Sequence, residues 1–206
     1  MKYYYYVIPR DYGFAPNPYF DYCTLATCKP GIRQNAQIGD WIAAYGAANS
    51  PVRGKLVMLM QVGETLTFDE YWEDSRFNSK RPVFNKGILH MYGDNIYHHI
   101  NGEWVQEPSH HSLVDGNINY VNLNTDTHSD RVLIASCFYY FGNNAVDIPV
   151  CFKELVGYGR GYRVCKNENL IKEFINYVSE NYNIGIHGIP FSRKYGKFAH
   201  YRGEGR

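Results

Sequence analysis

Histidines gather in one part of the sequence, between residues 90 and 128. Six of the eight histidines lie there: His90, His98, His99, His110, His111 and His128. A neutral imidazole beside an orienting carboxylate can act as a general acid or base near neutral pH. We therefore take His98, His110 and His111 as candidate catalytic groups, with Asp94 or Asp130 as the orienting carboxylate. The alternative is that single loop histidines only bind backbone groups or water.

The local pattern limits which of these histidines can face one pocket. The segment 96–106 predicts a β-hairpin with an Asn101-Gly102 turn, and adjacent strand residues point to opposite faces. His98 and His99 therefore cannot share a pocket, whereas Tyr97 lies on the face of His99. His110 and His111 fall in a polar loop between Ser109 and Ser112.

A second group of residues has the chemistry of nucleotide binding. Two prolines stiffen the aromatic loop 12–19, and a rigid loop loses little entropy when a ligand binds. The stacking candidates are Tyr12, Phe14, Trp41, Tyr97 and Tyr140; Asn17 or Asp40 would bind a base edge, and Arg33, Arg131 and Arg160 would bind phosphates. Alternatively, the loop covers one end of the fold, Asp130 pairs with Arg131, and Arg160 is a solvated arginine in the glycine-rich segment 157–163.

The cysteines do not predict a disulfide framework or a metal centre. Five cysteines are an odd number, typical of free or buried thiols. Cys23 and Cys28 lack a second cysteine pair at ligand spacing, so a zinc site would require histidines from elsewhere to converge. We predict no metal and no cofactor. A serine triad is also not predicted, because the sequence contains no Gly-x-Ser-x-Gly motif.

The elements that must position these groups are mostly strands. The pattern predicts strands at 3–8, 41–45, 55–62 and 131–141 besides the hairpin. Helices are expected at 29–36, at 68–74 after a Thr67 and Glu70 capping box, and from Asn167 to Gly185. The sequence therefore predicts an α+β fold with a curved or barrel-like, mostly antiparallel sheet, short flanking helices and one longer C-terminal helix.

Composition limits the class of protein. The 206 residues carry a net charge of +1, are 45% hydrophobic and include 20 Tyr, 11 Phe and 3 Trp. We expect one domain over 1–185 and a basic tail over 186–206. No apolar run approaches the length of a membrane span and no signal peptide is recognised, so we expect a cytoplasmic protein without membrane contact. The near-zero charge argues against strong nonspecific DNA binding.

Seven ordered segments between residues 3 and 163 resemble a known family. They are 12–18, 23–30, 39–42, 92–98, 109–112, 129–134 and 139–142. Together they are similar to the nucleotide modification associated domain 2 family of bacteria and their phages, which implies a context of modified DNA or phage defence. The Gly39 to Ile42 turn also resembles the PUA, ASCH and EVE barrels that bind modified bases. The resemblance implies no particular catalytic residue.

Three hypotheses for the function follow. The first is recognition of a modified base or nucleotide by stacking on aromatic side chains. The alternative is a nucleotide-modifying enzyme, a transferase, glycosylase or hydrolase that uses histidine as general acid or base. The third is a structural or partner-binding protein. The expected partner in the first two is a nucleotide or a modified DNA base; the sequence does not identify any protein partner.

Overall fold

The computed structural model describes residues 1–157, 159–193 and 197–201. The chain folds into two compact units. The first unit contains Met1–Asp11, Ala36–Glu64 and Ala135–Ser192, and the second contains Tyr12–Asn35, Thr65–Ile134 and Arg193–Arg206. Each unit is therefore built from segments that are far apart in the sequence.

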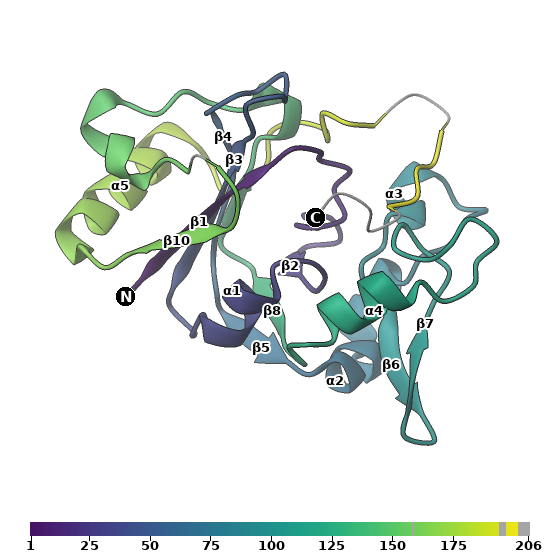
Figure 1. Cartoon of the computed structure of the whole chain (residues 1–206). Coiled ribbons are helices and arrows are strands. Elements are labelled where there is room, and N and C mark those ends of the chain that lie inside the picture. The colour runs from purple at the N-terminus through teal and green to yellow at the C-terminus, as the bar shows by residue number, and fades with distance from the viewer. Residues whose placement is uncertain (158, 194–196, 202–206) are drawn as a thin grey trace. The chain divides into compact units, whose positions relative to one another are not determined.

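The first unit is built on a six-stranded sheet (Figure 1). Its order is β10 (Tyr162–Cys165), β1 (Tyr3–Ile8), β3 (Trp41–Gly46), β4 (Leu56–Gln61), β9 (Phe138–Tyr140) and β11 (Gly185–Ile186). The β1–β3 and β9–β11 pairs are parallel, and the other three pairs are antiparallel. The unit also contains the 3₁₀ helices η2 (Gly142–Asn144) and η3 (Val150–Leu155).

The longest helix, α5 (Glu168–Asn181), belongs to the first unit. Asn167 caps it by accepting a hydrogen bond from the Leu170 N–H, as the sequence predicts. Ile171, Phe174 and Val178 recur at helical spacing and are fully buried in the core with residues of β1, β3 and β4. This core fixes the helix on the sheet.

The second unit combines short elements around a separate core. It contains α1 (Pro30–Asn35), α2 (Phe68–Glu73), η1 (Ser75–Lys80), α3 (Ile88–Met91), α4 (Tyr120–Asp126), the hairpin β6 (Tyr97–Ile100) with β7 (Glu103–Gln106), and most of the three-stranded sheet β2 (Cys23–Leu25), β8 (Val132–Ala135) and β5 (Glu64–Leu66). Its core includes Phe14, Phe68, Tyr71 and Tyr92. Figure 1 shows α4 beside the β6–β7 hairpin.

Local sequence signals explain two of these elements. Asn101 and Gly102 have φ angles of 53° and 83°, the left-handed values that a type I′ hairpin turn requires. Thr67 and Glu70 form the predicted capping box at the start of α2. Both predictions are confirmed.

Other expectations need correction. The mixed α+β class is confirmed, but the strands of the described residues form three separate sheets rather than a closed barrel. The single strand expected over 131–141 is wrong: β8 and β9 are separated by a bend at Ser136 and Cys137 and belong to different sheets. An apolar run does not reveal such a break, because both pieces are buried.

Two further features concern the organisation of the chain. Of the helices in the described part of the chain, none has the length and apolarity needed to cross a membrane. The division into a domain over 1–185 and a tail over 186–206 stays a prediction. Residues 194–196 and 202–206 of that tail, and residue 158 of the glycine-rich segment, lie outside the described residues.

Candidate functional site

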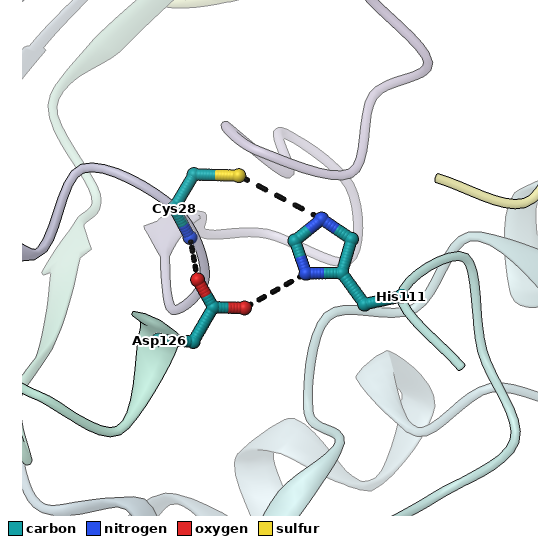
Figure 2. A group of neighbouring side chains, drawn as sticks. All are labelled: Cys28, His111 and Asp126. Carbon is teal, nitrogen blue, oxygen red and sulfur yellow. Dashed lines mark hydrogen bonds and ion pairs between the residues drawn. The ribbon is translucent and has the colours of Figure 1, made fainter. Parts of the chain in front are cut away.

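Three side chains of the second unit form a chain of contacts (Figure 2). Cys28 Sγ lies 3.7 Å from His111 Nε2, and the opposite ring nitrogen, Nδ1, lies 2.7 Å from Asp126 Oδ2. The second carboxylate oxygen of Asp126 accepts the Cys28 N–H at 2.7 Å. A thiol, an imidazole and a carboxylate are thus arranged in the order of a cysteine catalytic triad.

The local backbone presents Cys28 in an unusual conformation. Cys28 and Lys29 have φ angles of 58° and 43°, in the left-handed region that non-glycine residues rarely occupy. They form the turn between β2 and α1. A cysteine at positive φ between a strand and a helix resembles the strained turns that expose nucleophiles in hydrolases.

The fully buried Arg33 of α1 holds this turn in place. Its Nε donates to the Cys28 carbonyl at 2.9 Å, and its other guanidinium nitrogens donate to the carbonyls of Ser129, Arg131 and Asp126. One guanidinium therefore connects the backbone of the cysteine turn to the end of α4. Because Arg33 spans several carbonyls in a fixed fork, it can offset the cost of the strained turn.

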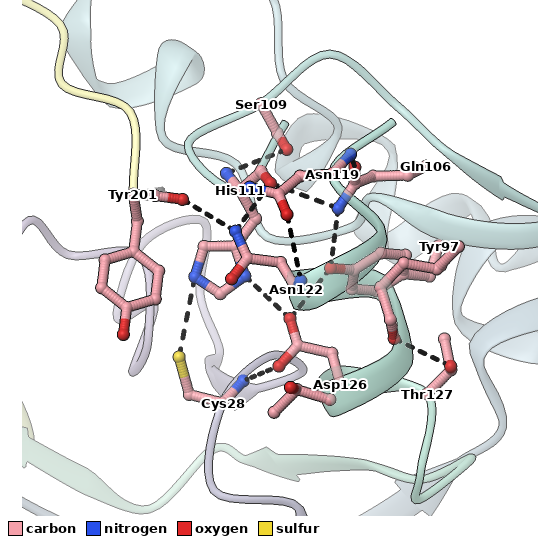
Figure 3. Close-up of polar contacts among 12 residues, drawn as sticks. Cys28, Tyr97, Gln106, Ser109, His111, Asn119, Asn122, Asp126, Thr127 and Tyr201 are labelled. Carbon is pink, nitrogen blue, oxygen red and sulfur yellow. Dashed lines mark hydrogen bonds and ion pairs between the residues drawn. The ribbon is translucent and has the colours of Figure 1, made fainter. Parts of the chain in front are cut away.

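Helix α4 positions Asp126 and Asn122. Asn119 caps this helix, and residues four apart lie on the same face. Asn122 Nδ2 donates to the His111 carbonyl at 2.8 Å, and Asp126 accepts a bond from the Tyr97 hydroxyl at 2.9 Å (Figure 3). The same helix face thus fixes both the backbone and the ring of His111.

The charges of the site follow from these contacts. Burial alone would lower the pKa of His111, but Asp126 and Cys28 outweigh it and raise the pKa to about 10. For Asp126, burial favours the neutral form, but His111 and Arg33 hold its pKa below the usual value. At neutral pH the site therefore contains a carboxylate and an imidazolium that donates through both ring nitrogens.

The same three residues are the group that could hold a metal ion among the described residues. Their potential ligand atoms lie within 4.8 Å of one another. Cys28 Sγ contacts Nε2 of His111, whereas Asp126 contacts Nδ1 through Oδ2 and the Cys28 N–H through Oδ1. The thiol and the carboxylate therefore contact different nitrogens of the same ring, as in a proton-transfer triad.

Aromatic rings surround the two adjacent histidines. The Phe14 ring lies 4.7 Å from the His111 ring, and the Tyr12 ring lies 4.8 Å from that of His110. The ring of Tyr201 lies 5.3 Å from that of His111. Aromatic side chains therefore lie beside both histidine rings.

The structure distributes the sequence-predicted residues over several places. Of these residues, Tyr12, Phe14, Arg33, Tyr97, His110 and His111 lie around the cysteine site. Asn17 and Asp94 belong to a different buried network of the second unit. The roles proposed for all of them stay predictions.

The remaining predicted residues have other surroundings. His98 stacks on Trp72 at 4.0 Å, and Asp130 accepts the Phe68 N–H. Arg131 donates to the Gln34 carbonyl. Four predicted residues belong to the first unit: Asp40, Trp41, Tyr140 and Arg160. Asp40 accepts the Lys2 N–H, and Tyr140 donates to Asp11. Trp41 is part of the core, and Arg160 is exposed.

Sequence reasoning missed two members of the site, Cys28 and Asp126. The sequence pattern suggests only a zinc-ligand role for Cys28, and Asp126 is one of three aspartates between residues 90 and 128. The available signal is a cysteine directly before a predicted helix, together with histidine and aspartate elsewhere. With five cysteines, that signal selects no particular partner.

Comparison with known families identifies the family of the chain. A family model described as nucleotide modification associated domain 2 matches residues 1–197. The chain belongs to this family. Membership of the nucleotide modification associated domain 2 family indicates a role connected with nucleotide or DNA modification. No curated protein and no solved structure matches the chain.

Proposed function

We propose that this chain is an enzyme that modifies a nucleotide, or a base in DNA, by covalent catalysis through Cys28. One observation supports this most: the thiol faces Nε2 of His111 while Asp126 holds Nδ1. Pure recognition of a base requires no nucleophile aligned with an acid and an orienting carboxylate. The enzyme hypothesis therefore explains the geometry better than the recognition hypothesis.

The arrangement suits transfer of an acyl-type group. Cys28, reacting as a thiolate beside Nε2 of His111, would attack a carbonyl carbon of the substrate and form a C–S bond. His111 would give its Nε2 proton to the leaving amine or alcohol as the bond to that group breaks. Water would then attack the thioester and lose a proton to His111, and the C–S bond would break to regenerate the thiolate.

Asp126 would act as a positioning residue. It fixes the His111 ring through Nδ1 and stabilises the imidazolium, as the carboxylate does in a serine triad. The half-buried Tyr12 and the buried Phe14 would form an aromatic wall for a planar base beside the reacting groups. Stacking and covalent chemistry would then belong to one site.

Turnover and trapping test this proposal. The protein would be incubated with modified and unmodified nucleosides, nucleotides and oligonucleotides, and products and Cys28 adducts followed by mass spectrometry. We expect a product that is lost in Cys28→Ala and His111→Gln and retained in Cys165→Ala, a half-buried cysteine of the first unit. Undiminished turnover in Cys28→Ala, or tight binding with no product, would contradict the enzyme hypothesis.

A further inference from the structure

The main chain of Ala199 to Tyr201 lies against the cysteine site within the second unit. The Tyr201 N–H donates to the His110 carbonyl at 2.6 Å, and Asn122 Nδ2 donates to the Tyr201 carbonyl at 2.7 Å. At the other end of this segment, the Ala199 N–H donates to the Tyr92 hydroxyl at 2.9 Å and His110 Nδ1 donates to the Ala199 carbonyl. These four hydrogen bonds hold the main chain of residues 199–201.

The groups that hold this segment are also those that build the site. His110 precedes the triad histidine, and Asn122 Nδ2 donates to the carbonyls of both His111 and Tyr201. His110 and Asn122 are at most 5% exposed. In Figure 3, Tyr201 lies on the Nε2 side of His111, where Cys28 also lies.

Two buried groups bind one donor–acceptor pair here. Asn122 supplies a donor and the His110 carbonyl supplies an acceptor, and both are satisfied by the C=O and N–H of a single residue, Tyr201. These two groups of Tyr201 belong to successive peptide units of the main chain, and the lactam edge of a pyrimidine base likewise presents an N–H beside a C=O. Without an occupant, the buried donor and acceptor would lose hydrogen bonds, which favours ligands with this pattern.

We propose that Asn122 and the His110 carbonyl form the substrate subsite of Cys28, that this subsite binds an adjacent N–H and C=O, and that residues 199–201 occupy it in the absence of substrate. The inference rests on the proposed function, because it takes Cys28 as the reacting group. Substrate and segment then compete for these two groups. Because the Tyr201 ring lies beside the His111 ring on the side of Cys28, release of the segment should open access to the thiol.

Alkylation of Cys28 by iodoacetamide, followed by peptide mass spectrometry, tests the occupancy. Tyr201→Pro removes both the N–H donor and the ring, and Tyr201→Ala removes the ring alone. We expect about tenfold faster labelling of Cys28 in Tyr201→Pro, which equals about 1.4 kcal/mol, and a smaller increase in Tyr201→Ala. Tyr120→Ala, which removes a 65% exposed tyrosine, and the exposed Cys151 serve as controls with unchanged rates.

Protection distinguishes the two sources of the donor–acceptor pair. Thymidine, which has a lactam edge, an amidated peptide of residues 197–201, and N3-methylthymidine, which lacks the lactam N–H, would be added to Tyr201→Pro. We expect thymidine or the peptide to return labelling toward the wild-type rate, and N3-methylthymidine to have no effect. Labelling of Tyr201→Pro at the wild-type rate, protection by N3-methylthymidine, or protection by none of the three would overturn the inference.

The proposed function is tested separately in the same assay. If Cys28 is activated by His111, labelling at pH 7 falls in His111→Gln whatever the effect of Tyr201→Pro. If only the subsite inference is wrong, the difference in labelling between the wild type and His111→Gln remains. If the proposed triad is wrong, that difference disappears.

Discussion

Two buried aspartates of the second unit invite comparison. We define the Asp126 network as Asp126 with Cys28, Arg33, Tyr97 and His111. The Asp94 network consists of Asp94 with Asn17, Tyr22, Thr24, Tyr71 and Lys80. Each contains a fully buried carboxylate, a buried cation and a tyrosine hydroxyl that donates at 2.9 Å.

The two networks differ in where they end. Lys80 Nζ uses all three of its N–H groups on the Asn17 side chain and on the carbonyls of Asn17 and Tyr22. Asp94 accepts from Thr24 and Tyr71. The Asp126 network instead ends at the half-buried thiol of Cys28.

The electrostatics differ in the same way. Burial raises the pKa of Asp94 despite Lys80 and two hydroxyl donors, whereas His111 and Arg33 hold that of Asp126 down against its burial. Burial also lowers the pKa of Lys80 to about 8, while His111 is raised to about 10. Similar residue types therefore produce a network of saturated hydrogen bonds in one place and a network that ends at a thiol in the other.

The largest expected effect separates the networks by catalysis. Asp126→Asn should lower turnover by about 10⁴-fold, as the equivalent change does in a serine triad, because His111 loses its orienting carboxylate. Asp94→Asn should leave turnover per folded molecule within about threefold, since Asp94 does not contact the site. Kinetics with the substrate found by product analysis measure both variants. Equal losses of turnover in Asp126→Asn and Asp94→Asn would contradict this distinction between the networks.

The next largest effect distinguishes the Asp94 and Asp126 networks by their contribution to the free energy of unfolding. Lys80→Met leaves the carbonyl and side-chain oxygens of Asn17 and the Tyr22 carbonyl without their buried donor, which should lower the free energy of unfolding by about 3–5 kcal/mol. Urea unfolding measures this loss. Alkylation of Cys28 in the folded variant should keep its wild-type rate; a slower rate would mean that the networks are coupled.

His111 and Lys80 should make the free energy of unfolding change with pH in opposite directions. The pKa of His111 is raised, so its contribution is complete below pH 6.5 and decreases toward pH 10, by about 2 kcal/mol between pH 6.5 and 8. The pKa of Lys80 is lowered, so folding gains stability as pH rises from 8 to 10.5.

Urea unfolding at several pH values checks these slopes. His111→Gln should remove the decrease between pH 6.5 and 8, and Lys80→Met should extend the decrease to pH 10. A wild-type curve that rises between pH 6.5 and 8, relative to His111→Gln, would contradict the imidazolium at His111.

The smallest effect concerns the two tyrosines. Tyr71→Phe and Tyr97→Phe each remove one hydroxyl donor to a buried carboxylate and should each cost about 1–3 kcal/mol of stability. Only Tyr97→Phe should also change the alkylation of Cys28, because Asp126 loses a partner beside His111. Thermal unfolding and labelling measure the two effects; equal labelling would place Tyr97 outside the site.

Short-range patterns made much of the fold predictable. The Asn167 cap of α5, the Thr67 and Glu70 capping box and the Asn101-Gly102 turn involve residues a few positions apart, and each is confirmed. The family resemblance also came from ordered local segments, and it is confirmed over residues 1–197. By itself, the sequence thus determined the local elements, the mixed α+β class and the family.

Tertiary structure alone decided the site and the sheets. Cys28 and His111 are 83 positions apart, and His111 and Asp126 are 15 apart, so no local pattern joins them. The break between β8 and β9 likewise depends on which sheet each buried piece enters. Long-range pairing of buried polar groups is set by the folded chain as a whole, because each such group must find a partner there.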